Sequence, residues 1–260
     1  MDLPDGLVLD NYEVPKQKIV KFIHDYVNQA GAEGVVLGLS GGVDSALVVS
    51  LSVEALGAKS VIGMIMPVEV TQDSDNVKDA KKHAESLGVS CKTFELKSLL
   101  EPFKPLELGS VALGNLKARL RMITLYTRAN QSNLLVIGTG NKSEIMTGYF
   151  TKHGDGGVDL LPIADLYKTD VRKLSELVGV PKPIIEKAPS AGLWANQTDE
   201  DELGVTYTEL DSILFLRFEK GFEFDQIVSW GIERKKVKRV FDLVQNSKHK
   251  RTPLPKVLIR

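Results

Sequence analysis

The chain has 260 residues, 43% hydrophobic and 26% charged, with a formal net charge of -1, as is typical of a globular protein large enough to bury a full core. A charge this close to zero gives no bulk attraction to nucleic acid or to a membrane. The first ten residues lack the regions of a secretory signal, and no apolar run is long enough to cross a bilayer. We therefore expect a cytoplasmic protein that binds neither nucleic acid nor a membrane.

Short apolar runs alternate with helical segments in the first half of the chain. Helices are predicted at residues 14–30, 44–56, 73–87 and 114–129, and strands at residues 35–39, 61–66, 91–96 and 134–137. Such alternation indicates an α/β fold, a Rossmann-like doubly wound parallel sheet with helices on both faces. Ligands are then expected beyond the carboxyl ends of the strands, after Leu39, Met66 and Ile137.

From residue 165 onward the pattern is helical. Additional C-terminal helices are predicted at residues 167–177, 183–187, 202–219, 224–230 and 233–246. Residues 190–201 are polar and have no clear period, so they are predicted to form a loop, with its mobility left open. No linker or repeat divides the chain, and the prediction is a single domain over residues 1–260.

The only cysteine, Cys91, excludes an internal disulfide and a cysteine-rich zinc site. Its neighbours are apolar and β-branched, which favours a role in filling a strand over a role as nucleophile.

A glycine-rich loop joins the first predicted strand to the second predicted helix. It consists of Gly38, Leu39, Ser40, Gly41, Gly42, Val43, Asp44 and Ser45. Its glycines let the backbone close on a ligand, and the first N–H groups of the helix and the serine hydroxyls can donate to a phosphate. A carboxylate repels phosphate, so Asp44 is interpreted either as the N-cap of the helix or as a ligand of Mg²⁺. The loop is neither a Walker A motif nor Gly-x-Gly-x-x-Gly.

Ser-Gly-Gly-x-Asp-Ser resembles the signature of ATP pyrophosphatases of the adenine nucleotide α-hydrolase type. These enzymes adenylate a carboxylate or carbonyl oxygen, release pyrophosphate, and let a nitrogen or sulfur nucleophile displace AMP. From about residue 16 to residue 255 the order of motifs resembles NAD synthetase. The motifs are residues 138–144, 147–159, 161–169, 187–194, 197–200, 203–207 and 249–251. The resemblance implies a ligase that amidates deamido-NAD with ammonia at the expense of ATP, as a homodimer with its substrate site at the interface.

The same resemblance implies a role for individual residues. Asp44 and Glu144 would hold Mg²⁺, while Lys168 would neutralise charge on the ATP phosphates. Thr139 and Ser190 would bind ATP with their hydroxyls, together with loop residues 38–45. The implied contacts of deamido-NAD are Arg119, Lys152, Asp159, His249 and Lys250. Asp155 would help to remove a proton from ammonium, since only neutral ammonia is a nucleophile.

These roles have structural alternatives. Glu144 alone is typical of a solvated carboxylate in a first helical turn, and Lys168 of a surface lysine. Arg119 lies next to the apolar stripe of its helix, so its head is expected to be partly buried and to need an anion, either a ligand or an intrachain carboxylate. Asp155 is also a plausible turn residue. The middle of residues 138–144 departs from the Gly-Thr-Asp-His-Ala-Ala-Glu common in bacterial members, so contacts to adenine and ribose are not transferred.

Other functions share parts of this pattern. A tRNA thiolase would have the same loop, but it would need a sulfur-carrying cysteine, usually more than one, and a basic face. A nucleotide-binding regulator would not need Glu144 or Lys168. The basic residues 247–251 are either a nucleic-acid patch or, more commonly, a solvated helix end. No stretch before Ser40 is long enough for a glutaminase domain, so we expect direct use of ammonia, with a separate glutaminase subunit left open.

Overall fold

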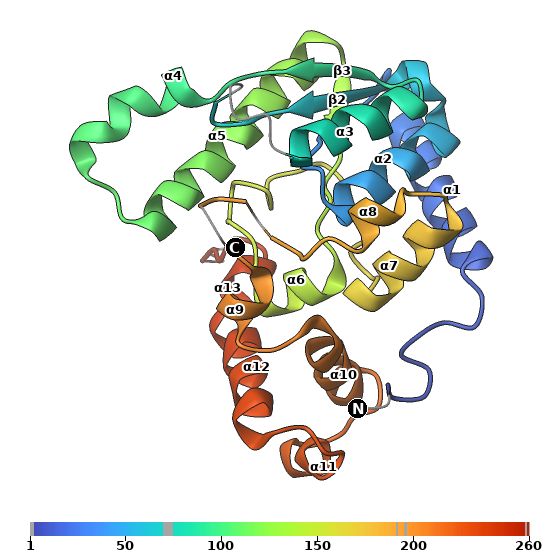
Figure 1. Cartoon of the computed structure of the whole chain (residues 1–260), viewed down its shortest axis with the longest axis vertical. Helices are drawn as coiled ribbons and strands as arrows, with labels where there is room; N and C mark the ends of the chain where they lie inside the picture. Colours follow the sequence, from blue (N-terminus) through green and yellow to red (C-terminus); the bar gives the residue numbers. More distant parts are fainter. Residues whose placement is uncertain (1–2, 70–74, 191, 195–196, 258, 260) are drawn as a thin grey trace.

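The computed structural model describes residues 3–69, 75–190, 192–194, 197–257 and 259 (Figure 1). Its strands are β1 (Gly34–Gly38), β2 (Val61–Ile65), β3 (Ser90–Thr93) and β4 (Leu134–Val136). They form a sheet in the order β3-β2-β1-β4, in which every pair is parallel. Since β2 and β4 flank β1 on opposite sides, the strand order reverses at β1, and the predicted doubly wound sheet is confirmed.

Alternate side chains of β1 enter two different apolar cores. Val35 and Leu37 pack with residues of α1 (Glu13–Gln29), α2 (Val43–Leu56) and α3 (Asp75–Ser86). Val36 faces the other way and packs with Leu120 and Ala129 of α5 (Ser110–Gln131). Both faces of the sheet are therefore covered by helices, as a parallel sheet requires.

The second half of the chain is mostly helical, and part of it packs on the sheet, since Val171, Leu174, Ile184 and Ile185 belong to the same apolar core as Val35 and Leu37. Its helices are α6 (Lys142–Thr147), α7 (Lys168–Leu177), α8 (Lys182–Ile185), α9 (Asp199–Leu203), α10 (Tyr207–Phe218), α11 (Phe224–Ser229), α12 (Arg234–Asn246) and α13 (Lys248–Arg251). Residues of α10, α11 and α12 share an apolar core with Leu7 and Tyr167. Figure 1 shows α6 and α7 between this core and the sheet. No helix in the described part of the chain is long and apolar enough to cross a membrane.

Several predicted boundaries were wrong. The helix predicted at residues 202–219 is two helices, because Gly204 takes φ 76° and ends α9, while the Thr206 side chain caps α10. β3 ends at Thr93 rather than at residue 96. The predicted helix 73–87 begins outside the described residues and is seen from Asp75 to Ser86. Five short elements of the described residues were not predicted: the 3₁₀ helices Ala58–Ser60 and Glu101–Leu106, α4 (Lys97–Leu100), α6 and α13.

Candidate active site

The glycine-rich loop follows β1 and is held closed by its two serines. The Ser45 hydroxyl donates to the carbonyl of Gly42 at 3.0 Å, lies 3.1 Å from the Ser40 hydroxyl, and accepts from the Ser40 N–H at 3.3 Å. Gly41 has φ +80°, and a Cβ there would lie 2.2 Å from the carbonyl oxygen of Asn76. The conformation and the close packing against α3 both require glycine at this position. Gly42 is the N-cap of α2 and has no side-chain cap, so the first N–H groups of the helix face the loop's interior.

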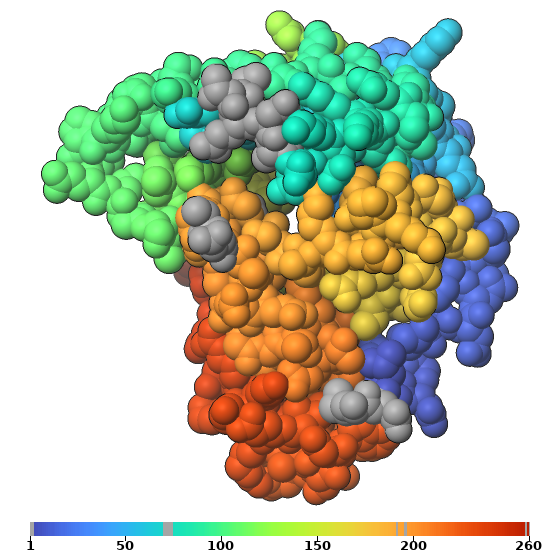
Figure 2. Space-filling view, in the orientation of Figure 1, coloured from blue at the N-terminus to red at the C-terminus, as the bar shows by residue number. Residues whose placement is uncertain are grey.

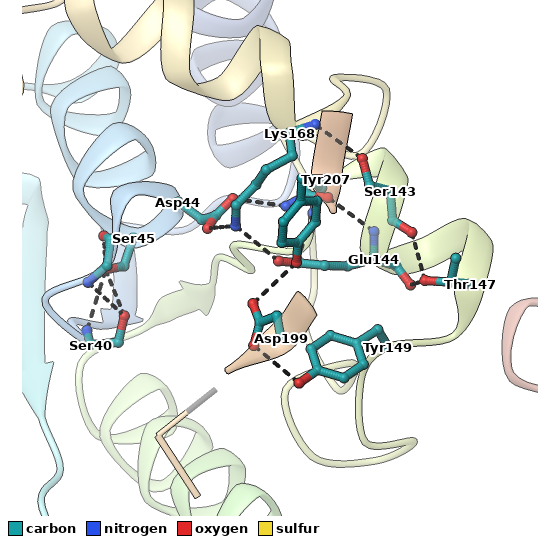
Figure 3. Close-up of polar contacts among 12 residues, drawn as sticks. Ser40, Asp44, Ser45, Ser143, Glu144, Thr147, Tyr149, Lys168, Asp199 and Tyr207 are labelled. Atoms are coloured by element: carbon teal, nitrogen blue, oxygen red, sulfur yellow. Dashed lines mark hydrogen bonds and ion pairs between the residues drawn. The ribbon is translucent and has the colours of Figure 1, made fainter. Parts of the chain in front are cut away.

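Lys168 joins this loop to α6 (Figure 3). Its Nζ lies 2.5 Å from Oδ2 of Asp44 and 3.3 Å from Oε1 of Glu144. The lysine is 2% exposed, and its Nζ lies 4.9 Å from the ring centroid of Tyr207. Lys168 is therefore not a surface lysine. Asp44 is not the N-cap, because Gly42 occupies that position and Asp44 is the second residue of α2.

Burial and nearby charges shift the pKa values of Glu144 and Lys168 away from their ordinary ranges. Burial raises the pKa of Glu144 to about 8; the nearby charge of Asp44 raises it as well, and Lys168 opposes them. Burial alone would lower the pKa of Lys168, but attraction to Asp44 and Glu144 outweighs burial and raises it above its usual range. Two carboxylates thus share one ammonium, and the cluster is short of positive charge.

The pair Asp44 and Glu144 fits a Mg²⁺ ion that phosphate oxygens complete. Mg²⁺ takes oxygen ligands and is usually bound through one or two carboxylates plus substrate phosphates. Among the described residues, no group of three or more His, Cys, Asp or Glu side chains could hold a metal ion. These residues suit an ion that arrives with a nucleotide better than an ion held in a cage of protein ligands alone.

Glu144 is fixed by a capping box at the start of α6. The Asn141 side chain accepts from the Glu144 N–H at 3.0 Å, and Oε2 of Glu144 accepts from the Asn141 N–H at 3.2 Å. Asn141 also donates to Asp44 at 2.9 Å. One oxygen of Glu144 therefore caps its own helix while the other faces Lys168. The Asn-x-x-Glu spacing is a sequence signal for this helix start that the prediction overlooked.

A fully buried carboxylate behind the site, Asp211 of α10, couples the helices that carry Glu144 and Lys168. Its Oδ1 accepts from the Ser143 hydroxyl at 2.5 Å, and its Oδ2 accepts from the Thr169 N–H at 2.8 Å. The Lys168 N–H donates in turn to the Ser143 hydroxyl at 3.0 Å. Burial raises the pKa of Asp211 to about 6.

Asp211→Asn should therefore disturb the site and not only the fold. An amide nitrogen would meet a donor where Asp211 now accepts, which should cost about 1–3 kcal/mol of unfolding free energy and lower turnover by about tenfold. Asp170→Asn is a matched control, because Asp170 is also buried at the start of α7 but binds the Tyr12 hydroxyl and the Tyr167 N–H. Denaturant unfolding and steady-state kinetics would be compared for both variants. Equal losses of turnover at equal losses of stability would refute a positioning role.

A pocket of about 270 Å³ opens beside Glu144. Its lining residues are Thr139, Gly140, Glu144, Ile145, Phe150, Asp155, Gly156, Leu161, Lys250 and Arg251. The Lys250 ammonium donates to the carbonyls of Gly148 and Phe150, each at 2.7 Å, and burial lowers its pKa. Asp155 accepts from the Thr151 N–H at 2.9 Å as a turn residue would, and desolvation of its carboxyl raises its pKa. The pocket combines apolar walls with the carboxyl groups of Glu144 and Asp155 and the cationic groups of Lys250 and Arg251.

Four of the five residues expected to contact the dinucleotide lie together. Arg119 donates to the carbonyl of Lys152 at 3.3 Å, Lys152 donates to the carbonyl of His249 at 3.1 Å, and Lys250 follows His249 in the chain. Asp159 is separate from these contacts: its carboxylate accepts from the Tyr126 hydroxyl at 2.9 Å and from the Val136 N–H at 2.7 Å.

The expected burial of Arg119 was wrong. Arg119 is exposed and, within the described residues, forms no ion pair. Two positions further along α5, Arg121 is partly buried and donates to the carbonyl of Met66 at 3.2 Å. A difference of two residues turns a side chain to nearly the opposite side of a helix, and the apolar stripe was too loosely defined to decide between them.

Ser190 lies on a segment that is tied to the glycine-rich loop. Its hydroxyl accepts from the Gly192 N–H at 3.1 Å. Lys187 donates to Asn76 at 2.8 Å and to Asp79 at 2.5 Å, and the backbone of Asn76 is the group against which Gly41 packs. Figure 2 shows the orange residues after α8 spread over the middle of this face, between α5 and α7. Of the predicted loop 190–201, residues 191, 195 and 196 lie outside the described residues, and the last three belong to α9.

One acidic residue of the site was missed by the sequence analysis. Asp199 is 4% exposed and accepts from the hydroxyls of Tyr149 at 3.0 Å and Tyr207 at 3.1 Å (Figure 3). Burial raises its pKa, and the charge of Lys168 lowers it. Tyr149, Asp199 and Tyr207 lie in three separate motifs of the sequence, and nothing in the local spacing of any one motif indicates that their side chains meet. Cys91, by contrast, lies in β3 as expected, and burial raises the pKa of its thiol, which is unfavourable for a nucleophile.

The reversal of strand order, the glycine-rich loop at a helix N-terminus and the lysine-bridged carboxylates are typical of a nucleotide-binding α/β enzyme. The chain belongs to the NAD synthase family, whose model matches residues 16–254. This match favours the amidating enzyme over the tRNA thiolase and over a regulator without turnover.

Relatives with assigned activities match along almost the whole chain. The NH(3)-dependent NAD(+) synthetase of Archaeoglobus fulgidus is 49% identical over 252 residues, covering 96% of this chain and 98% of that protein. The structure of NMN synthetase from Francisella tularensis superposes with a TM-score of 0.83 at 38% identity, over 95% of this chain and 98% of that one. The NH3-dependent NAD synthetase from Campylobacter jejuni gives a TM-score of 0.81 at 31% identity, over 95% and 99% of the two chains.

Proposed function

We propose that this chain is an ammonia-dependent NAD synthetase, a ligase that converts deamido-NAD to NAD while ATP is split to AMP and pyrophosphate. The observation that carries the proposal is the position of Lys168. It bridges a carboxylate of the phosphate-binding loop and a carboxylate that lines the neighbouring pocket. A nucleotide held by the loop and an acceptor held in the pocket would meet at this lysine.

The reaction needs two displacements. The nicotinate carboxylate attacks the α-phosphorus of ATP, the bond from that phosphorus to the β-phosphate oxygen breaks, and pyrophosphate leaves. Ammonia then attacks the activated carbonyl, the bond to AMP breaks, and one proton is lost from nitrogen. A free carboxylate resists ammonia because its leaving group would be oxide, whereas AMP is a good leaving group.

On the ATP side, the N–H groups and serine hydroxyls of residues 38–45 would bind phosphate oxygens. Lys168 would stabilise charge that builds on the phosphates, and the Thr139 and Ser190 hydroxyls would orient the nucleotide. Asp44 and Glu144 would hold Mg²⁺. When bound, the ion would neutralise phosphate charge and polarise the phosphorus under attack.

On the acceptor side, the apolar walls of the pocket suit a flat pyridine ring, and Lys250 suits an anion. The acceptor site would continue along the surface through Arg119, Lys152 and His249. We also propose that Asp159 contacts deamido-NAD. Asp155 would accept the proton of ammonium, because a carboxyl with a raised pKa is a stronger base than an ordinary one.

The test is an assay with ATP, Mg²⁺, ammonium and deamido-NAD, in which NAD and AMP should appear in equal amounts. Nicotinate mononucleotide should be run as a second acceptor, because one structural neighbour is an NMN synthetase. Glutamine should replace ammonium poorly. Formation of AMP out of step with NAD, or equal rates with glutamine alone, would overturn this proposal. The expected cytoplasmic location and the single-domain organisation stay predictions.

The metal-free protein should lose stability as the pH rises. The pKa of Glu144 is about 8 in the folded protein against an ordinary value of 4.5, so the folded state holds this proton more tightly than the unfolded chain. Stability from this group is complete below about pH 4 and declines up to about pH 8. Denaturant unfolding across this range should show a smaller decline for Glu144→Gln than for wild type, and saturating Mg²⁺ should flatten the wild-type curve. If stability fell equally steeply with pH in Glu144→Gln and in wild type, the prediction would be wrong.

We also propose a homodimer with α5 near the two-fold axis. Ile123 is 54% exposed on the same side of α5 as Arg119, and a large exposed apolar side chain beside a substrate residue suits an interface that completes the site. Ile123→Glu should therefore shift the protein to a monomer in light scattering and reduce NAD formation. Leu177→Glu, at a 46% exposed position at the end of α7, should change neither property. A stable wild-type monomer with full activity would refute the dimer.

A further inference from the structure

We infer that Lys117 and Arg121 of α5 form a second phosphate-binding element, which holds the polyphosphate of ATP and the pyrophosphate derived from it. This inference deepens the proposed function and rests on it for the identity of the nucleotide. Neither residue was singled out in the sequence, and neither belongs to the set assigned to ATP or to deamido-NAD above.

The position of Arg121 follows from its neighbours. Its Nε donates to the carbonyl of Met66, which directly follows β2 at the carboxyl edge of the sheet. A Cβ on Gly38 would lie 3.4 Å from the Met66 side chain and 4.0 Å from that of Leu125, which is one helical turn after Arg121 in α5. Gly38 is the last residue of β1 and the first of the loop. Arg121 precedes Leu125 by four residues and therefore lies about 6 Å closer to the N-terminus of α5. This places it beyond the carboxyl edge of the sheet, on the side where the loop would receive a phosphate.

Lys117 lies one turn before Arg121 on the same side of α5. Its Nζ donates to the carbonyl of Leu193 at 2.5 Å. A Cβ on Gly114, one turn earlier, would meet Leu193 and Trp194 at 3.1–3.2 Å, so this side of α5 packs closely under residues 193–194. The two cations thus lie between the sheet edge and the segment that follows Ser190.

Both cations lack a carboxylate partner. Within the described residues neither forms an ion pair, and each donates a hydrogen bond to a neutral carbonyl. Burial lowers the pKa of both groups, and Arg121 lowers that of Lys117 further. The charge of Asp155 partly opposes the effect of burial on Arg121, although the two form no ion pair within the described residues. Two desolvated cations that repel each other are costly to keep unless an anion binds between them.

The charged groups around Lys168 do not compensate the negative charge of a bound triphosphate. Asp44, Glu144 and Asp199 place three carboxylates around the single ammonium of Lys168. One divalent cation would only bring this cluster to neutrality. The negative charge of the triphosphate would then remain uncompensated, and the loop itself supplies no basic side chain. Lys117 and Arg121 are suitably placed to supply that compensation.

The geometry favours ATP over the diphosphate of the dinucleotide. Arg121 is linked through Met66 and Leu125 to the end of β1 and β2, where the loop begins. The residues proposed for the dinucleotide, Lys152 and His249, contact each other on an exposed surface beside α13. A polyphosphate in contact with Arg121 would therefore be the one that the loop holds.

The experiment measures binding of inorganic pyrophosphate, of ATP and of deamido-NAD separately, by calorimetry on the full-length protein. The variants are Arg121→Gln, Arg121→Lys and Lys117→Gln. The matched control is Arg128→Gln, because Arg128 is on the same helix seven residues from Arg121 and its guanidinium donates to the Gln131 side chain at 3.3 Å. Thermal unfolding would identify any variant that fails to fold.

We expect Arg121→Gln to raise the Kd of pyrophosphate and of ATP by about tenfold or more and to change the Kd of deamido-NAD by less than about twofold. Lys117→Gln should have a smaller effect in the same direction. Arg121→Lys should recover part of the loss, and Arg128→Gln should match wild type. Unchanged binding of pyrophosphate and ATP in the folded variants would overturn the inference. A loss confined to deamido-NAD would also overturn it, in favour of the dinucleotide diphosphate. Pyrophosphate binding does not depend on turnover, so a failure of NAD formation would count against the proposed function alone.

Discussion

Lys168→Met is expected to lower kcat/KM for NAD formation by about 1000-fold or more. The lysine would neutralise the phosphates during adenylation, and removal of one preorganised donor of this kind costs about 100- to 1000-fold. Its loss also leaves Asp44 and Glu144 facing each other without the ammonium that now lies 2.5 Å and 3.3 Å from them. Initial-rate measurements at saturating ammonium, with ATP and deamido-NAD varied in turn, would give the value.

Lys168→Met should also lower the thermal stability of the substrate-free protein. Removal of one partner from a buried ion pair typically costs about 3–5 kcal/mol, so the metal-free protein should unfold at a lower temperature. Mg²⁺ should restore part of that loss, because a cation between the two carboxylates would replace the missing charge. Stabilisation by Mg²⁺ should be greater for Lys168→Met than for wild type.

Lys142 provides a matched control for these effects. Its Nζ also joins two carboxylates, Asp165 at 2.8 Å and Glu219 at 2.7 Å, and lies 4.8 Å from a tyrosine ring centroid. Its side chain is 18% exposed, against 3% for Lys168, and its partners face solvent. Lys142→Met should cost about 1 kcal/mol or less and leave turnover nearly unchanged. Comparable losses of turnover in both variants would show that Lys168 acts through packing alone.

The parts of the fold that follow from local pattern were predicted well. Val35, Val36 and Leu37 are all buried because both faces of a parallel sheet are covered, and such a strand is a continuous apolar run. The loop of residues 38–45 was found because its glycines and serines are contiguous. Glu144 and Lys168 were found only through a resemblance to a family, since neither residue alone distinguishes a site from a solvated surface.

The parts that were missed depend on contacts between distant segments. Asp211 lies 68 residues from Ser143, to which it is hydrogen-bonded, and nothing near it in the sequence shows that it supports Lys168. Asp199 lies in a stretch that is polar enough to resemble an ordinary loop, although two tyrosine hydroxyls enclose it. The break at Gly204 is different, because the glycine and the Thr-x-x-Glu cap that follows it were visible in the sequence. There, the prediction gave more weight to a long helical pattern than to the helix stop and start signals within it.

Asp44→Asn and Glu144→Gln are expected to lower turnover by about 100- to 1000-fold each, and to do so without loss of the fold. Both replacements keep the shape of the side chain. In Glu144→Gln the new amide oxygen would still accept from the Asn141 N–H at the start of α6. In Asp44→Asn the amide oxygen would still accept from the Asn141 side chain, which now lies 2.9 Å away. What each variant loses is one negative oxygen toward Lys168, and with it half of the pair proposed to hold Mg²⁺.

The pattern of metal dependence distinguishes this role from a merely structural one. If the two carboxylates act on one ion, each single variant should require a higher concentration of Mg²⁺ for half-maximal rate, and the double variant should lose little more than the worse single one. Independent sites would give losses that multiply. In both variants Lys168 should also titrate at lower pH, because attraction to these carboxylates is what raises its pKa above the effect of burial. Unchanged Mg²⁺ dependence in both single variants, at full stability, would remove Asp44 and Glu144 from the metal site.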